Sequence, residues 1–498
     1  MRQAGNVGMT ANTKNKKNNG IGYWMAEVLK EADKAATDFS ADPVHDLRVA
    51  IRRCRSMADG FRALDPAPAW RKMKKAGKAV FSSLGELRDV QVMHEWVQKL
   101  GSEDDLVTQR LIDHCVRRER ELKHHAAAAL HSFDRKQWSE WAVELEQRAR
   151  RFRPGGDLFQ VVALERLQEA YQLHRVAMRN RSKTAYHAVR IGLKKFRYMV
   201  ENFLPAPHQA WGKDLKELQD LLGEVHDLDV LEDTAQQIGA YASSKGRARW
   251  RKRIREERDL RLKRYREKMV GRSSLWIVWR AGLPTGERLK KAIERKLRIW
   301  AAFLDPDPLH TQRVLRISLQ LHDGLRRFGL LPEASDGIPC RDLLKTAVWG
   351  HEVGRAKSAQ GHHKRSQRLI AELDLPPGWS REQLQMAALI ARYHRGALPH
   401  TDHRLFQELT PEHKRMVKSL AGVLRLADAF DNPHNGLAHD VKLEKLSNCV
   451  LVRAPGYRAD SRRAEKLAAA RHLLETSCGV PILIRKARPA VRATPQGK

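Results

Sequence analysis

The sequence HDLRVAIRRCR at residues 45–55 returns as HAVRIGLKKFR at residues 187–197, an offset of 142 residues (187 − 45 = 142). In both copies a histidine is followed by cations three, seven, eight and ten positions later. A second pair follows in the same order, with LGELRDVQV at 84–92 and LGEVHDLDV at 222–230. Two matched pairs in one order indicate a duplicated module.

Helical geometry places the repeated cations on one face, because offsets 0, 3, 7 and 10 share a side of a helix with 3.6 residues per turn. The two stripes are His45, Arg48, Arg52 and Arg55, and His187, Arg190, Lys194 and Arg197. The border positions, which can face either way, are Arg53 and Lys195. Beside the first stripe an apolar one predicts the buried side: Leu47, Ala50, Ile51, Cys54, Met57, Ala58 and Phe61. Further cations stand at matched places, ten and seven residues before Gly85 and Gly223: Lys75, Lys78, Lys213 and Lys216.

A basic helix face is most often a solvated surface, in which Lys and Arg alternate with Glu and Asp. Residues 181–197 instead contain six cations and no carboxylate, and the stripe occurs twice. The pattern therefore favours a surface that binds a polyanionic ligand.

The whole composition points the same way. The 498 residues include 93 Lys and Arg against 59 Asp and Glu, a net charge of +34, which favours nucleic acid, an anionic membrane surface or a phosphate polymer as partner. No apolar run approaches the length of a membrane span. Five scattered cysteines without a CxxC pattern are typical of unpaired thiols in a reducing cytoplasm. We therefore expect a cytoplasmic protein that does not enter a membrane.

The chain reads as a mainly α protein with several parts. We expect a disordered basic tail at 1–20, two helical repeats at about 21–153 and 157–275, and a linker at 276–286. A second, histidine-rich helical region follows at 287–436. Residues 437–486 predict a strand, a helix from Arg462 to Leu474, and a second strand, before a tail at 487–498.

The duplicated stripes and the two LGE motifs behind them closely resemble the CHAD family, the conserved histidine α-helical domain, over about 21–275. The resemblance implies two helical bundles related by a pseudo-twofold axis, basic stripes that line a shared channel, and inorganic polyphosphate as ligand. The family's binding residues correspond to His45, Arg48, Arg52, Arg55, Lys78, His187, Arg190, Lys194, Arg197 and Lys216. To these we add the neighbouring cations Arg53, Lys75, Lys195 and Lys213.

One difference between the two copies bears on their chemistry, because Gln91 stands where the second copy has Asp229. We therefore interpret Asp89 and Asp227 as carboxylates that brace the cations, or as caps, and not as catalytic groups. Polyphosphate suits the stripes because it offers only charged oxygens for guanidinium forks and ammonium groups, with no bases to stack. The expected partners are polyphosphate, its granules and polyphosphate-metabolising enzymes. Non-specific nucleic-acid binding is a weaker alternative.

The second region presents His310, the pair His351-Glu352, His394 and Asp428 in that order on predicted helices. This order resembles the HD superfamily of metal-dependent phosphohydrolases, in which the first His, the His-Asp pair and the last Asp bind a divalent metal that activates water. More specifically, RYHRGALP at 392–399, LAGVLRLADAFD at 420–431 and the closing strands resemble the C-terminal region of the exopolyphosphatase / guanosine pentaphosphatase (Ppx/GppA) family.

Two interpretations of this region stay open. The resemblance implies an accessory helical domain without catalysis. The alternative is a metal-dependent phosphohydrolase with a metal site made of His310, His351, Glu352 and Asp428. Glu352 replaces the usual Asp, and Arg365 stands before Ser366 where the family usually has His, although His362 and His363 are near enough in sequence to compensate. We therefore predict no tightly bound transition metal, no cofactor, and an ion pair of Asp428 with Arg365 or Arg425.

Overall fold

The structure is a computed structural model that describes residues 20–37, 41–241, 243–331, 334–335, 337–431 and 440–487. The chain divides into two compact units, Met1–Pro284 (unit 1) and Thr285–Lys498 (unit 2), with the boundary inside the predicted linker. Apart from Gly20 and Ala487, the predicted tails at 1–20 and 487–498 lie outside the described residues. Within the described ranges no helix combines the length and the apolar character needed to cross a bilayer.

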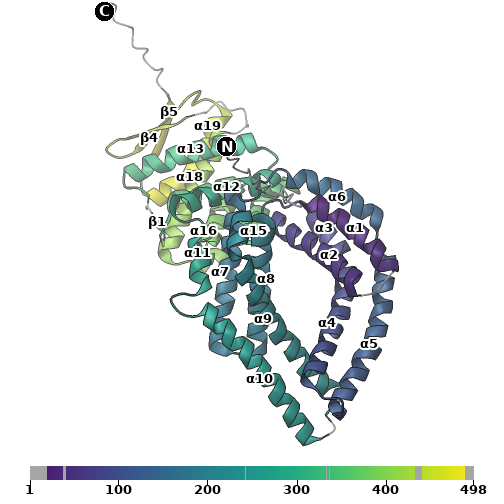
Figure 1. Cartoon of the computed structure of the whole chain (residues 1–498). Coiled ribbons are helices and arrows are strands. Elements are labelled where there is room, and N and C mark those ends of the chain that lie inside the picture. The colour runs from purple at the N-terminus through teal and green to yellow at the C-terminus, as the bar shows by residue number, and fades with distance from the viewer. Residues whose placement is uncertain are drawn as a thin grey trace, which may run out of the picture. The chain divides into compact units, whose positions relative to one another are not determined.

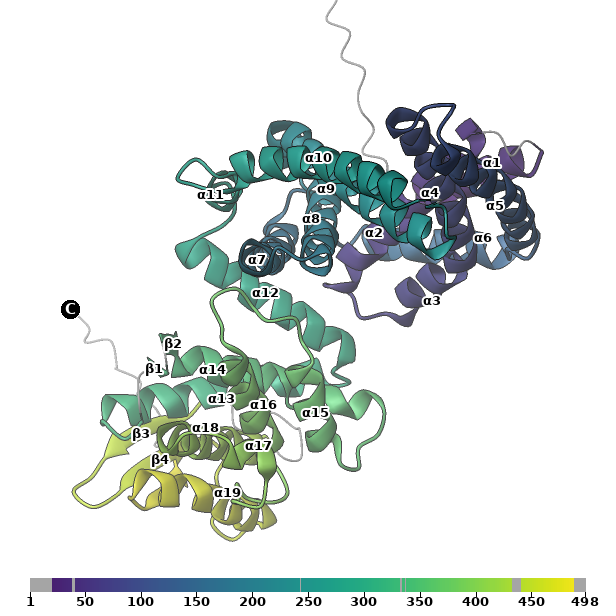
Figure 2. The same ribbon diagram turned by 90° about the horizontal axis from the view of Figure 1, so that it is seen from below.

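Unit 1 is helical throughout its regular elements (Figures 1 and 2). The first repeat comprises α1 (Ile21–Thr37), α2 (Ala41–Arg62), α3 (Pro68–Ala76), α4 (Lys78–Leu100), α5 (Leu106–His131) and α6 (Arg135–Ala149). The second comprises α7 (Asp157–Asn180), α8 (Lys183–Phe203), α9 (Pro205–Gln237), α10 (Ser244–Met269) and α11 (Leu275–Ala281). Helix α11 occupies part of the predicted linker, and its buried Trp279 packs against Phe196.

The packing of unit 1 reproduces the duplication seen in the sequence. Helix α1 packs on α2 as α7 packs on α8, and α4 packs on α5 as α9 packs on α10. Helix α6 contacts α1 as α11 contacts α7. The repeats differ in how the LGE motif is reached, because Gly77 separates α3 from α4 where the second repeat has the single helix α9.

The predicted apolar stripe of α2 is buried, and every member from Leu47 to Phe61 is at most 5% exposed. At its end Phe61 meets Phe203 of α8 edge to face, with ring centroids 5.1 Å apart. Gly60 permits this approach, because a Cβ there would lie 2.3 Å from the Phe203 ring. The helices that carry the two stripes are therefore packed against each other.

Unit 2 is helical with two small sheets. Its helices are α12 (Gly286–Leu304), α13 (Pro308–Arg327), α14 (Cys340–Gly350), the 3-10 helix η1 (Val353–Ala356), α15 (His362–Ala371), α16 (Arg381–Arg392), α17 (Arg404–Gln407), α18 (Pro411–Phe430) and α19 (Arg462–Cys478). Its strands are β1 (Ala334–Ser335), β2 (Ile338–Pro339), β3 (Lys442–Lys445), β4 (Val450–Ala454) and β5 (Ile482–Lys486). Helix α18 contributes most of its length to the core and packs against α13, α14, α16 and α19.

The predicted strand–helix–strand is present at the end of unit 2. Strands β4 and β5 are parallel, and α19 connects them. Strand β3, which was not predicted, adds antiparallel to β4 with Leu443 opposite Val452. Its sequence, KLEK, has a single apolar residue and so gives no strand signal. The predicted mainly α fold with a small C-terminal sheet is confirmed.

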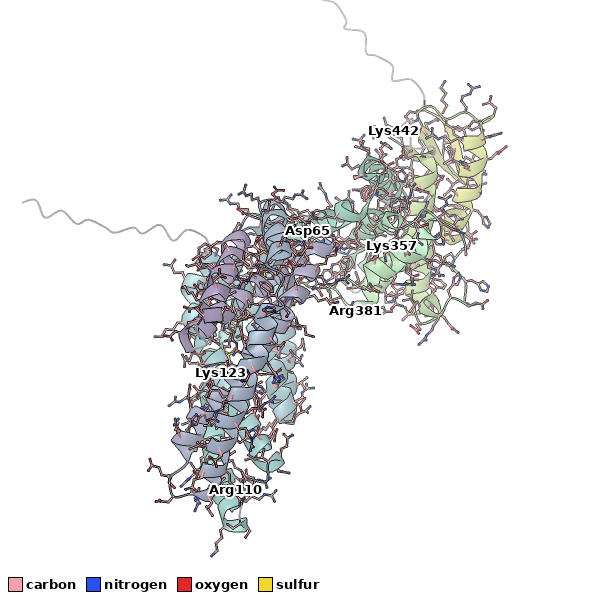
Figure 3. The ribbon with its side chains drawn as sticks, turned by 90° about the vertical axis from the view of Figure 1, so that its right-hand side faces the viewer. Asp65, Arg110, Lys123, Lys357, Arg381 and Lys442 are labelled. Atoms are coloured by element: carbon pink, nitrogen blue, oxygen red, sulfur yellow. The ribbon has the colours of Figure 1, made fainter. Side chains whose placement is uncertain are left out.

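A buried carboxylate connects the α2–α3 turn to α6. Asp65 is fully buried and accepts hydrogen bonds from Arg148 Nε at 2.7 Å, Arg148 Nη2 at 3.0 Å, Trp70 Nε1 at 3.1 Å and the Ala67 amide at 3.0 Å. Figure 3 labels its position. Burial alone would raise the pKa of Asp65, but the bonds from Arg148, Trp70 and Ala67 hold it below its usual value.

We predict that Asp65→Asn lowers the free energy of unfolding by about 2–4 kcal/mol at pH 7, because Arg148 loses its buried counter-charge. Since the folded-state pKa of Asp65 is depressed, the wild type's advantage is present above the unfolded pKa of about 4 and is lost as pH falls through the folded pKa. Urea unfolding of both proteins between pH 7 and pH 3 measures this. Asp113→Asn, at an exposed position on α5, is the control, and an equal loss there would contradict the prediction.

Candidate functional site

Helices α2 and α8 of unit 1 bring cations of both repeats together. Arg48 and Arg52 extend from α2 and Arg190 and Lys194 from α8, and these four residues are named the basic cluster. The Tyr198 ring centroid lies 5.8 Å from the Arg52 guanidinium carbon and 6.0 Å from Lys194 Nζ. Burial, together with the charges of the other three members, lowers the pKa of Lys194 to about 8. The two stripes therefore act on each other electrostatically.

Two carboxylates adjoin the basic cluster, Asp89 of α4 and Asp227 of α9. Asp89 Oδ1 lies 3.9 Å from Arg48 Nη2, as expected for a carboxylate that braces a cation. Burial raises the pKa of Asp89 against the opposing charges of the cluster, and burial raises the pKa of Asp227 to about 6 although Arg190 opposes it. In the part of the chain that the structure describes, the other three cluster members form no salt bridge. Positive charge is therefore in excess.

Two residues beside the cluster were missed by the sequence reasoning, Tyr198 and His226. The rings of His187 and His226 lie 4.6 Å apart. Burial, with the charges of Arg190, His187 and Lys194, lowers the pKa of His226 to about 4, so this imidazole is neutral at pH 7. One signal was present, because His226 occupies the place of Arg88 in the duplicated motif.

The other predicted ligands differ in their surroundings. Arg53 pairs with Glu201 of the other repeat, and Lys195 Nζ lies 2.7 Å from Glu169 Oε1, so both border cations have carboxylate partners. Arg55 donates to the Lys74 carbonyl at 2.6 Å, Arg197 lies 3.8 Å from Glu201, and Lys216 lies 2.6 Å from Asp220. Among the predicted ligand residues, seven are exposed: His45, Lys75, Lys78, His187, Lys195, Lys213 and Lys216.

A cavity of about 670 Å³ lies between α4, α5 and α9. Asp89 is part of its wall, so the cavity adjoins the basic cluster. The wall formed by α5 carries Arg117 and Arg118 but also Glu121, which pairs with Arg118 at 2.8 Å. This wall is therefore less positive than the cluster itself, and the shared channel implied by the CHAD resemblance stays a prediction.

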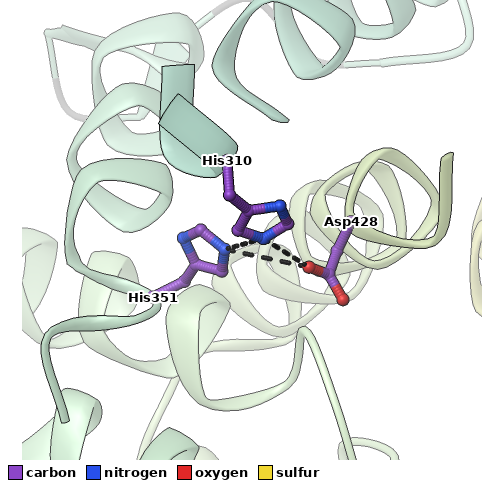
Figure 4. A group of neighbouring side chains, drawn as sticks. All are labelled: His310, His351 and Asp428. Carbon is purple, nitrogen blue, oxygen red and sulfur yellow. Dashed lines mark hydrogen bonds and ion pairs between the residues drawn. The ribbon is translucent and has the colours of Figure 1, made fainter. Parts of the chain in front are cut away.

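In unit 2, three of the four predicted metal-site candidates converge (Figure 4). His310 is on α13, His351 follows α14, and Asp428 is on α18. His310 Nε2 lies 3.1 Å from Asp428 Oδ1 and 3.4 Å from His351 Nε2, and His351 Nε2 lies 3.9 Å from Asp428 Oδ1. Both imidazoles are buried, while the Asp428 side chain is 21% exposed. This group is named the first triad.

Glu352, the fourth candidate, belongs to a second group with His362 of α15 and His394 after α16. Glu352 Oε1 lies 3.0 Å from His362 Nε2 and 3.7 Å from His394 Nε2, and the two Nε2 atoms lie 3.2 Å apart. All three residues are buried. This group is named the second triad. His394 was not among the predicted metal ligands, and His362 was named only as a neighbour that could compensate for Arg365.

The predicted ion pair of Asp428 with Arg365 or Arg425 is wrong. Arg365 donates to three backbone carbonyls, those of Gly354, Ser358 and Gln360. Arg425 donates to the carbonyls of Tyr393 and Gly396. Both guanidinium groups hold loops in place, and the contacts of Asp428 are with histidines. The cation that was expected to oppose a metal is therefore engaged elsewhere.

The electrostatics of the first triad favour an ionised acid among imidazoles. Burial would raise the pKa of Asp428, but His310, His394 and His351 hold it at about 2. Burial lowers the pKa of His351, and it lowers that of His394 to about 3. Burial also acts to lower the pKa of His310, yet Asp428 and Asp431 raise it overall. A neutral imidazole and an ionised carboxylate are the forms that bind metal ions.

Comparison with known proteins assigns a relative to each unit. The family model of the CHAD domain matches residues 25–236, and that of Ppx/GppA phosphatase, domain III, matches residues 300–450. The crystal structure of the CHAD domain from the plant Ricinus communis is similar at 20% identity and a TM-score of 0.37, over 53% of this chain and 88% of that chain. No curated protein matches the chain. The two resemblances seen in the sequence motifs are confirmed: this chain joins a CHAD-type region to a region of the Ppx/GppA domain III type.

Proposed function

We propose that unit 1 binds inorganic polyphosphate at the basic cluster. The observation that supports this most is the gathering of four cations from two repeats, where burial and the charges of the other three members lower the pKa of Lys194 to about 8. Like charges that are partly buried repel one another and lose hydration, and an anion between them gives each cation a counter-charge. Polyphosphate granules and polyphosphate-metabolising enzymes are the partners that this proposal implies.

The chemistry of the cluster favours a phosphate chain over nucleic acid. The cluster presents three guanidinium forks and one ammonium group, which suit charged oxygens. Its neighbouring aromatic ring, Tyr198, is 9% exposed and lies against Arg52, Lys194 and Arg197, so it offers no open face to a base. Proteins that bind single-stranded nucleic acid generally need such stacking faces.

Phosphohydrolysis by unit 2 is a second candidate function, favoured by the convergence of His310, His351 and Asp428. A divalent metal bound there would supply an activated water for attack on phosphorus. His310 and His351 would hold the ion through Nε2, and Asp428 through a carboxylate oxygen. In this candidate function a substrate would reach the triad from the side on which the Asp428 side chain is 21% exposed.

We predict that the fourfold change Arg48→Glu, Arg52→Glu, Arg190→Glu and Lys194→Glu abolishes polyphosphate binding while circular dichroism shows the helices intact. The affinity of the wild type should fall steeply with salt. By analogy with other single-stranded polyanions, the log–log slope is about −0.7 per phosphate neutralised. Fluorescence anisotropy with labelled polyphosphate, in the presence of competing single-stranded DNA, measures both.

The matched control reverses four exposed cations outside the cluster: Lys136→Glu, Lys245→Glu, Arg255→Glu and Arg272→Glu. It changes the net charge equally, so it should retain most of the affinity. An equal loss of polyphosphate affinity in both variants would show that binding depends on the net charge and not on the basic cluster. Stronger competition by DNA than by polyphosphate would favour the nucleic-acid alternative.

We predict that binding takes up protons and strengthens as pH falls from about 9 to about 6. In the free protein the pKa of Lys194 is lowered to about 8 and that of Asp227 is raised to about 6. A bound polyanion favours the charged lysine and the neutral acid, so it raises both pKa values. Calorimetry in buffers of different ionisation enthalpy measures the uptake. Lys194→Arg keeps the charge and should remove the uptake near pH 8, and an unchanged uptake in this variant would refute the assignment.

A further inference from the structure

The histidines of the two triads are all oriented in the same way. His351, His362 and His394 each direct Nδ1 at the backbone carbonyl three residues earlier, at 2.6, 2.9 and 2.6 Å. A carbonyl oxygen only accepts hydrogen bonds, so Nδ1 carries the proton in each ring. When such a ring is neutral, its Nε2 atom carries a lone pair. It is this Nε2 atom that faces the other members of the triad.

His310 follows the same rule with a carboxylate in place of a carbonyl. Its Nδ1 lies 2.7 Å from Oδ2 of the buried Asp431, whose Oδ1 accepts from Arg313 Nε at 2.8 Å. Nδ1 therefore donates, and Nε2 is again directed into the first triad. A carboxylate behind an imidazole is the usual outer partner of a histidine that ligates a metal, because it fixes the tautomer and the ring orientation.

This orientation brings lone pairs face to face. The Nε2 atoms of His310 and His351 are 3.4 Å apart, and those of His362 and His394 are 3.2 Å apart. Two lone pairs at such distances repel unless a cation lies between them. Two nitrogens bound to one ion at about 2.0–2.1 Å, with a tetrahedral angle, are about 3.3–3.4 Å apart. The observed spacings are those of two ligands on a common ion.

Each triad also supplies one carboxylate oxygen close to the Nε2 atoms of its histidines. Asp428 Oδ1 lies 3.1 Å from His310 Nε2, and Glu352 Oε1 lies 3.0 Å from His362 Nε2. Arg355 Nη1 donates to Glu352 Oε2 at 2.6 Å, which leaves Oε1 to face the histidines. The glutamate that departs from the HD pattern thus serves the second triad.

We propose that unit 2 binds two divalent transition-metal ions, one in each triad, with Glu352, His362 and His394 as the ligands of the second ion. The triads adjoin, because the rings of His351 and His394 meet edge to face with centroids 5.0 Å apart. Imidazole with carboxylate favours manganese, iron, cobalt or zinc over magnesium and calcium. Three protein ligands leave a coordination position open at each ion. This site does not depend on polyphosphate binding by unit 1.

The rival arrangement places a proton, not an ion, between each pair of Nε2 atoms. One imidazolium in each pair would then donate to the other ring, and the triads would be buried polar networks without a ligand. The two arrangements differ in metal content and in the magnetic properties of the loaded protein.

The test uses the full chain, purified without a histidine tag, stripped with a chelator and dialysed against Mn²⁺ or Zn²⁺. Mass spectrometry of the metal content should give two ions per chain for the wild type. The double variant His362→Gln, His394→Gln and the double variant His310→Gln, Asp428→Asn should each retain one ion. The control His400→Gln, His472→Gln changes exposed histidines outside the triads and should retain two.

A second measurement does not rely on variants that fold. Electron paramagnetic resonance of the Mn²⁺-loaded wild type should show the spin coupling of two neighbouring ions, and chelation should lower the melting temperature. Absence of bound metal after dialysis would establish the protonated network and overturn the proposal. A single uncoupled ion, lost in both double variants, would overturn the second site.

Discussion

The burial and mutual repulsion of four cations are the constraint on which unit 1 depends. The fall in the pKa of Lys194 from 10.5 to about 8 corresponds to about 3 kcal/mol against its charged form, and burial is the largest cause. Helices α2 and α8 stay together because apolar side chains at their ends pack closely. Burial of the rings of Phe61 and Phe203 contributes about 1.5–3 kcal/mol for each ring, so the two rings together are of the same order as the cost at Lys194. The salt bridge of Arg53 with Glu201 joins the same two helices.

In unit 2, as in unit 1, groups that repel one another are held together, but here the groups are negative or electron-rich. Its triads gather carboxylate oxygens and the Nε2 atoms of four imidazoles, and lone pairs at these positions repel one another unless a cation or a proton lies between them. The supporting contacts are backbone carbonyls behind three histidines and the Asp431–Arg313 pair behind His310. Because helix ends and loops supply these contacts, the orientation of each ring is set by the fold. Helix α18, which packs against α19 where Gly422 allows the Leu474 backbone to approach, positions Asp428.

Periodicity and repetition predicted what lies on one face of a helix. The offsets of the basic stripe identified α2 and α8, the burial of Leu47 to Phe61, and the four residues that converge. The partners that a side chain meets from distant positions in the sequence were not predictable from periodicity. Arg53 and Lys195 were assigned to the ligand on the strength of the pattern, yet Glu201 and Glu169 pair with them from distant positions.

The triads show this limit most clearly. His351 and Glu352 are adjacent in sequence and shared one metal site in the alternative interpretation, but they belong to different triads. The direction of a side chain after a helix end depends on the local backbone, which a motif does not specify. Arg365 was expected to disturb the site because it replaces a histidine in the pattern. Its guanidinium group instead donates to the carbonyls around η1. This role depends on the backbone conformation of the loop, which the sequence motif does not specify.

The two proposed sites would hold phosphate by opposite means. In the proposed function, unit 1 presents its cations directly to a phosphate chain, whatever the metal content of the solution. Unit 2 presents the ionised Asp428, which repels phosphate oxygens unless a divalent ion lies between. In the proposed arrangement, metal loading therefore changes the electrostatic potential at the triads of unit 2 from negative to positive. The potential at the basic cluster of unit 1 is unaltered. Binding without turnover is then the expected behaviour of the metal-free chain, and it follows from the charges of the two sites alone.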